Sequence, residues 1–186
     1  MKNSAWKAFA IWGTLGAAGF GLIACSAQGG VASGSKAPAF SAQGTDGKTY
    51  SLQSLSASGA AILYFIKEGC PVNHQAAPFL AKLSNAYENK ASLFGVYNGT
   101  LANAKDWAKR YGAKFTILAD PDLKIIRGYG VPYSPFLVEV GPGGKVGKLV
   151  GDGNPKNLAV ANRILASGLG KQLVELSFSG APEGGG

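Results

Sequence analysis

The chain has 186 residues, of which 46% are hydrophobic and 15% are charged, a composition typical of one globular domain. Its 18 basic and 10 acidic residues give a formal net charge of +8, without a dense basic cluster interleaved with aromatic residues, so a nucleic-acid-binding protein is not supported. One histidine and two cysteines are too few for a zinc or iron–sulfur site. We therefore expect no metal and no cofactor.

Residues 1–24 have the features of a signal peptide, because lysines precede a charge-free apolar run that is short for a membrane span. The run ends in Leu-Ile-Ala-Cys, which resembles the lipobox of bacterial lipoproteins, and this resemblance implies that Cys25 is acylated. Residues 25–36 are rich in glycine and serine and predict a flexible tether. We expect a protein on the extracytoplasmic or periplasmic face of the cell envelope, anchored to the membrane through lipid on Cys25. The alternative is an ordinary secretory leader that leaves Cys25 free or removes it.

The folded part is expected to begin with a β-hairpin over residues 39–55, because an Asp-Gly pair separates two loosely alternating runs. Residues 60–66 are continuously apolar, which predicts a central strand covered on both faces. An amphipathic helix should follow from about Asn73 to Glu88, with a kink at Pro78.

The second half alternates strands and helices. Residues 92–97 and 115–119 predict two more strands, and the helix between them should start near Thr100 and stop at Gly112. Further along the chain, we expect a short helix capped by Asp120-Pro121, a second hairpin over 136–140 and 145–150, and a last helix capped by Asn154-Pro155. The domain should span residues 37–168, and residues 169–186 should form a C-terminal segment with a flexible glycine-rich tail.

The sequence around the second cysteine, GCPVNHQAAPFL at residues 69–80, is similar to the active-site segment of the redoxin, AhpC/TSA and TlpA-like group of the thioredoxin superfamily. In that group a CxxC motif opens a helix that carries a proline and a leucine at these offsets. Further agreement extends the resemblance over about residues 34–168. It implies an α/β, thioredoxin-like fold, with a central mixed β-sheet flanked by helices and an extra N-terminal β-hairpin.

The motif departs from the family at three positions. Asn73 replaces the second cysteine of CxxC, so a dithiol cycle is not available. Leu63 and Lys67 stand where the peroxiredoxin pattern PxxxTxxC has its proline and threonine. With Cys25 lipidated, Cys70 is the one thiol left, and any redox chemistry must be intermolecular.

Cys70 is the candidate nucleophile, because backbone N–H groups at a helix N-terminus favour a thiolate there. Asn73 could hydrogen-bond the sulfur or a substrate oxygen, and His74 could exchange a proton near neutral pH. A helix-cap role for Asn73 and a solvent-facing His74 stay open as alternatives.

Three further residues are candidate substrate-binding residues. Pro71 directly follows the thiol, as it does in many relatives. Ser134-Pro135, just before the strand 136–140, resembles the cis-proline element whose preceding backbone receives an extended substrate in thioredoxin-fold proteins.

The leading hypothesis is a one-cysteine thiol redox protein that reduces a peroxide or a disulfide through a sulfenic acid or a mixed disulfide. Its partner would be an external thiol reductant or a thiol/disulfide protein. The alternative is a redox-inactive binding or scaffold module that kept the fold. A metal or haem-delivery role is a third possibility, for which the sequence offers no ligands.

Overall fold

The computed structural model describes residues 30–57, 59–87 and 92–184. The predicted signal peptide, the predicted lipidation site Cys25 and most of the predicted tether lie outside the described residues. Within the described ranges, no helix is long and apolar enough to cross a membrane.

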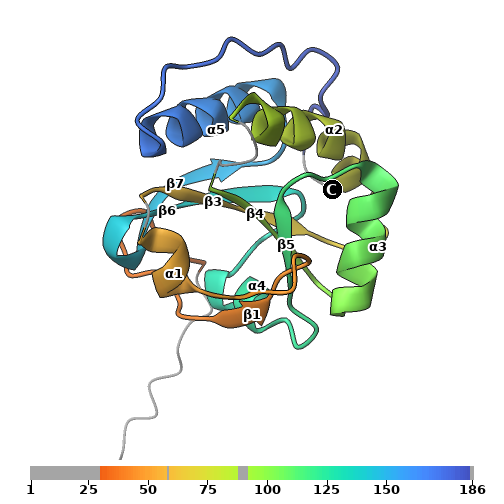
Figure 1. The fold of residues 1–186 in the computed structure, drawn as a ribbon, viewed down its shortest axis with the longest axis vertical. Coiled ribbons are helices and arrows are strands. Elements are labelled where there is room, and N and C mark those ends of the chain that lie inside the picture. Colours follow the sequence, from red (N-terminus) through yellow and green to blue (C-terminus); the bar gives the residue numbers. More distant parts are fainter. Residues whose placement is uncertain (1–29, 58, 88–91, 185–186) are drawn as a thin grey trace, which may run out of the picture.

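A five-stranded sheet in the order β5-β4-β3-β6-β7 forms the centre of the fold (Figure 1). The strands β3, β4 and β5 are parallel to one another, whereas β6 and β7 are antiparallel to their neighbours. The sheet is therefore mixed, and the predicted thioredoxin-like α/β fold is confirmed. The bounds of the strands are β3 (Ala61–Ile66), β4 (Leu93–Tyr97), β5 (Thr116–Ala119), β6 (Phe136–Gly141) and β7 (Lys145–Gly151).

Helices cover both faces of this sheet. The helices α2 and α5 lie on one face, and α1 and α4 lie on the other (Figure 1). The helix α3 packs beside β5 and contributes Ala104 and Trp107 to the core on the α2 side. The bounds of the helices are α1 (Leu52–Ser56), α2 (Pro71–Ala86), α3 (Leu101–Tyr111), α4 (Lys124–Tyr129) and α5 (Pro155–Gly168).

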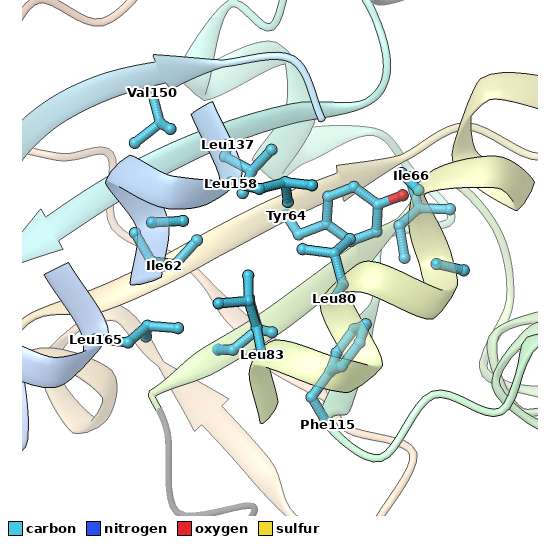
Figure 2. Packing of buried hydrophobic residues seen from close by; sticks show 14 of the residues in the cluster. Ile62, Tyr64, Ile66, Leu80, Leu83, Phe115, Leu137, Val150, Leu158 and Leu165 are labelled. Carbon is cyan, nitrogen blue, oxygen red and sulfur yellow. The ribbon is translucent and has the colours of Figure 1, made fainter. Parts of the chain in front are cut away.

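The strand β3 is central and buried along its whole length, as its continuous apolar run predicts. Ile62 and Tyr64 face α2 and α5, where Figure 2 shows them packed with Leu80 and Leu158. Leu63, by the alternation of a strand, belongs to the core on the opposite face. This burial on both faces fixes the strand from which the Cys70 loop emerges.

The predicted N-terminal hairpin is present as β1 (Ser41–Gln43) and β2 (Thr49–Ser51), which pair antiparallel. Its second arm is shorter than predicted, because the hydroxyls of Ser51 and Ser54 form a capping box that starts α1. The same N-terminal region covers both edges of the main sheet, through a bridge from Lys36 to β7 and one from Gly44 to β5.

Two helix starts differ from the sequence-based expectation. The helix α2 begins at Pro71 rather than Asn73, because a proline at the first helical position has no N–H to leave unpaired. Asp120 is not the N-cap of α4. That position belongs to Leu123, in the left-handed region at φ 58°, and the Asp120 carboxylate instead accepts hydrogen bonds from the N–H groups of Ile125 and Ile126.

The C-terminal segment packs on the fold up to Pro182. It crosses α5 and α2 after α5 ends (Figure 1), with Phe178 6% exposed and Ala181 buried as well. The carbonyl of Val174 accepts a hydrogen bond from Asn162, and that of Ser177 accepts one from Lys82. Residues 171–182, which contain one glycine, therefore reach the core through Phe178, Ala181 and Pro182.

Candidate active site around Cys70

Cys70 is the N-cap residue of α2 and lies directly beyond the carboxyl end of β3. Gly69, with φ 72°, lets the chain reverse before it, and the Cys70 N–H donates to the Lys67 carbonyl at 3.2 Å. The Cys70 side chain is 8% exposed, and its thiol donates to the Ser134 carbonyl at 3.5 Å. The candidate nucleophile thus faces the loop before β6, which is far away in sequence.

Ser134 and Pro135 are joined by a cis peptide bond, and both residues are buried. The predicted cis-proline element and the predicted nucleophile are therefore side by side. Pro71, the other candidate substrate-binding residue, is exposed at the first position of α2.

The Ser134 hydroxyl is the centre of a buried hydrogen-bond network. It donates to the Phe65 carbonyl at 3.0 Å, and it accepts from the Lys67 N–H at 3.0 Å. It also accepts from the Asn73 side-chain amide at 2.7 Å. The network ties the end of β3, the start of α2 and the cis-proline loop together, so that the surroundings of the sulfur are preorganised.

Asn73 is completely buried and turns its side chain toward Tyr64 and Ser134. The Tyr64 hydroxyl donates to the Asn73 side-chain oxygen at 2.7 Å. Burial raises the pKa of Tyr64 well above its usual value, and the nearby Cys70 raises it further, so the phenol stays protonated and keeps this bond. These contacts are those of a positioning residue, and a direct catalytic role for Asn73 stays a prediction.

His74 points away from this network. Its ring stacks on Tyr111 of α3, with a centroid distance of 4.4 Å and an interplanar angle of 14°. It is neither fully solvent-facing nor placed with Ser134. The structure thus brings Cys70, Asn73, Ser134 and Pro135 together but sets His74 against α3.

An apolar cavity of about 260 Å³ opens beside the cis-proline loop. Tyr133 and Ser134 form one wall, and Lys67 lies at the end of β3. Leu123 contributes another wall from a left-handed backbone conformation, which is uncommon for a residue with a side chain. Drug-sized ligands occupy pockets of about 300–1,000 Å³, so this cavity suits a smaller apolar group such as one side chain.

Sequence reasoning missed the network and the left-handed Leu123. A usable signal for the network was Tyr64, because a tyrosine in a fully buried strand needs a partner for its hydroxyl. In the described part of the chain, no group of three or more His, Cys, Asp or Glu side chains is placed to hold a metal ion.

The chain matches the model of the AhpC/TSA family over residues 33–149. A curated relative, chloroplastic peroxiredoxin Q of Triticum aestivum, is 29% identical over 109 residues, which are 58% of this chain and 50% of the relative. The chain thus spans about half the length of the curated relatives it matches.

Two solved structures are similar in fold. One, of a proposed protein disulfide isomerase from Bacteroides thetaiotaomicron, has 26% identity and a TM-score of 0.62 over 73% of this chain and 91% of the other. The second, of a proposed thiol:disulfide interchange protein DsbE from Chlorobium tepidum, has 24% identity and a TM-score of 0.63. The match covers 75% of this chain and 99% of the other. With the family model covering more than half of its residues, the chain belongs to the AhpC/TSA family.

Proposed function

We propose that this protein is a one-cysteine thiol redox protein of the cell envelope, and that Cys70 attacks disulfides to form a mixed disulfide. The observation that carries the proposal is the position of the Cys70 thiol, 3.5 Å from the Ser134 carbonyl and next to cis-Pro135. A disulfide held along this loop would present a sulfur to the Cys70 thiolate. The thiolate would displace one half of the disulfide as a thiolate, and an external thiol would then free Cys70.

The surroundings of the sulfur favour a disulfide over a peroxide as the substrate. Leu63 and Lys67 stand at the positions of the peroxiredoxin proline and threonine, and Leu63 is a fully buried core residue. The apolar cavity beside Ser134 supports a substrate with an apolar side chain near its disulfide. The similar structure from Bacteroides thetaiotaomicron, that of a proposed protein disulfide isomerase, supports the same chemistry.

The proposal is tested on the full chain with Cys25→Ser, so that Cys70 is the only thiol. Incubation with excess 5,5'-dithiobis(2-nitrobenzoate) at neutral pH should add one nitrothiobenzoate group to the folded protein, as read by intact mass. The matched control with Cys25→Ser and Cys70→Ser should gain nothing. If hydrogen peroxide adds one oxygen much faster than the disulfide adds its group, the substrate is a peroxide and the proposal is wrong.

A redox-inactive binding module is the second candidate, because the Cys70 side chain is buried and its thiol donates a hydrogen bond within the protein. If the protein is such a binding module, Cys70 should react with 5,5'-dithiobis(2-nitrobenzoate) only after the chain is unfolded in urea. Reaction in the folded state at a rate near that of the unfolded chain would exclude it.

We also propose that lipid on Cys25 anchors the domain to the membrane. The proposal rests on the Leu-Ile-Ala-Cys sequence and on the glycine- and serine-rich stretch that follows it. Cells fed labelled palmitate should label the wild-type chain and not the Cys25→Ser variant. Equal labelling of both chains would contradict the anchor at this residue.

A further inference from the structure

The described chain enters the fold alongside α4. Gly30 lies against the end of this helix, where a Cβ added to it would be 2.9 Å from the Gly130 carbonyl oxygen. Farther along, a Cβ added to Gly128 would lie 3.2 Å from the Pro38 side chain. Residues 30–38 therefore run beside α4, on the side of the sheet opposite α2 and α5 (Figure 1).

The same segment then reaches the start of β7. Lys36 and Lys145 are paired across an antiparallel bridge, and the Gly34 N–H donates to the Val146 carbonyl at 2.8 Å. Residues 30–38 thus join α4 to the first residues of β7, and the three pieces of chain are neighbours in space.

These three pieces of chain carry no acidic residue. Residues 30–38, 123–132 and 141–146 contain neither aspartate nor glutamate. A surface whose charges have one sign attracts partners of the opposite sign. Their basic residues are all exposed, and we call them the basic face: Lys36, Lys124, Arg127 and Lys145.

The charges of the basic face are mostly unpaired. Lys124 and Arg127 are three positions apart on α4, so they share the outer side of this helix. Lys124 pairs with Asp122, which precedes the helix, at 3.4 Å. Within the ranges that the structure describes, Lys36, Arg127 and Lys145 take part in no ion pair. Three charges are therefore available to a partner outside the chain.

The proposed lipid anchor lies close to this face. Cys25 and Gly30 are five positions apart in the sequence. A chain spans at most about 3.6 Å per residue, so five residues span at most about 18 Å. Lipid on Cys25 would therefore hold the end of α4 within this distance of the membrane.

A second set of basic side chains, on α3, is placed differently. Lys105, Lys109 and Arg110 are exposed there, but Asp106 lies among them. The helix α3 packs beside β5, which is the edge of the sheet farthest from β7. It therefore offers a matched control for the basic face.

We propose that the basic face docks on anionic phospholipid headgroups of the membrane to which Cys25 is tethered. Each lysine or arginine near such a surface strengthens binding about fivefold. The attraction falls off over a Debye length of about 8 Å at physiological ionic strength, so it requires a surface held as close as the short tether holds this one. The inference rests on the proposed anchor at Cys25 and not on the chemistry of Cys70.

Docking brings the candidate redox site close to the bilayer. Ile126 and Val131 line the apolar cavity beside Ser134. In the chain they flank Arg127 and Gly130, which lie on the basic face and at the point where the chain enters. The cavity thus borders the docked surface.

Acetylation of lysines measures docking on the anchored protein itself. The wild-type chain, isolated from cell membranes, is reconstituted on phosphatidylcholine vesicles with or without phosphatidylglycerol and treated briefly with sulfosuccinimidyl acetate. By peptide mass, the lysines of the basic face should react at least about threefold more slowly on the anionic vesicles, because headgroups cover them. High salt should remove the difference. Lys105 and Lys109 should react equally on both kinds of vesicle.

Two variants with equal changes of charge separate the basic face from overall charge. Lys36→Gln with Lys145→Gln should abolish the protection of Lys124, because the face loses two of its charges. Lys105→Gln with Lys109→Gln on α3 should leave Lys124 protected. Equal loss of protection in both variants would show that net charge alone attracts the domain, and the proposal would be wrong.

Flotation of the same preparations separates the basic face from the anchor. If the chain floats with both kinds of vesicle but the lysines of the basic face react alike on them, the anchor stands and the docking proposal is overturned. If it floats only with anionic vesicles and these lysines are protected, the basic face binds lipid and the anchor at Cys25 fails. If it floats with neither, both proposals fail.

Discussion

Asn73 shows how one residue can alter a redox site while preserving its structure. Its side chain joins the Tyr64 hydroxyl to the Ser134 hydroxyl, each over 2.7 Å, at the place where relatives with a CxxC motif have a second thiol. An amide can donate and accept at once, and a thiol is weak in both roles. The buried polar network therefore depends on Asn73 more than on Cys70, which contributes a single contact of 3.5 Å to the Ser134 carbonyl.

Asn73→Cys should restore a thiol pair at the expense of this network. Side chains three residues apart at a helix start are close enough for a bridge, so oxidation should form an intramolecular disulfide between Cys70 and the introduced thiol. On the Cys25→Ser background this disulfide is seen as a loss of two hydrogens by mass. Before oxidation, the free energy of unfolding should fall by about 1–3 kcal/mol, because two buried hydroxyls lose a partner.

Asn73→Ala is the matched control for that experiment. It removes the same hydrogen bonds and supplies no thiol, so its free energy of unfolding should fall by a similar amount, measured by urea denaturation. A variant Asn73→Ala as stable as the wild type would show that the network contributes little to folding.

At the scale of the element, α2 contains two prolines in unlike positions. Pro71 is the first residue of the helix, where a missing N–H costs nothing, whereas Pro78 is inside it and leaves the carbonyl four residues earlier without its helical partner. The helix nevertheless runs unbroken from Pro71 to Ala86, because its apolar residues are buried against β3 and α5. Tertiary packing thus overrides a strong local preference.

Pro78→Ala should stabilise the protein. A proline in the interior destabilises a helix by about 3 kcal/mol, and alanine removes part of this destabilisation because it restores the backbone N–H. Alanine also makes the unfolded chain more flexible, which lowers the stability of the folded state by about 0.4–1 kcal/mol. We therefore expect the free energy of unfolding to rise by about 1–2 kcal/mol, measured by urea denaturation. Pro71→Ala, the control in the same helix, should not increase stability. Equal gains from both substitutions would contradict the argument from position.

At the scale of the whole molecule, the C-terminal segment closes the core on the α2 and α5 side. Phe178 belongs to the same buried cluster as Tyr64 and Leu80, although it lies in no helix or strand. The segment reaches the neighbourhood of the site, since a Cβ added to Gly153 would lie 3.5 Å from Pro135 and 3.9 Å from Pro182. The tail is therefore part of the packing behind the cis-proline loop.

Phe178→Ala should lower the free energy of unfolding by about 3–5 kcal/mol, the range for truncation of a buried phenylalanine to alanine. The control is Leu173→Ala in the same segment, where the side chain is 42% exposed and the change should stay within about 0.5 kcal/mol. Urea denaturation followed by circular dichroism measures both. If Phe178→Ala behaves like Leu173→Ala, the segment does not stabilise the fold.

Local pattern by itself predicted most of the elements. The uninterrupted apolar run of β3 indicated a strand covered on two faces, and Thr100 and Gly112 marked the ends of α3 as N-cap and left-handed C-cap. The placement of Cys70 between that strand and a helix also follows from the sequence. These features depend on neighbours within a few residues, so periodicity and capping preferences are sufficient to predict them.

The tertiary structure alone decided which side chains meet. Asn73 and Ser134 are 61 positions apart, and their contact depends on how α2 is rotated about its axis when it packs on the sheet. The same rotation turns His74 toward Tyr111 and away from the sulfur. Phe178 is buried in the cluster formed with residues of α2 and α5, which the sequence of residues 171–182 by itself does not reveal. Sequence periodicity identifies the buried face of an element, but the partner on the other side is set by the packing of the whole chain.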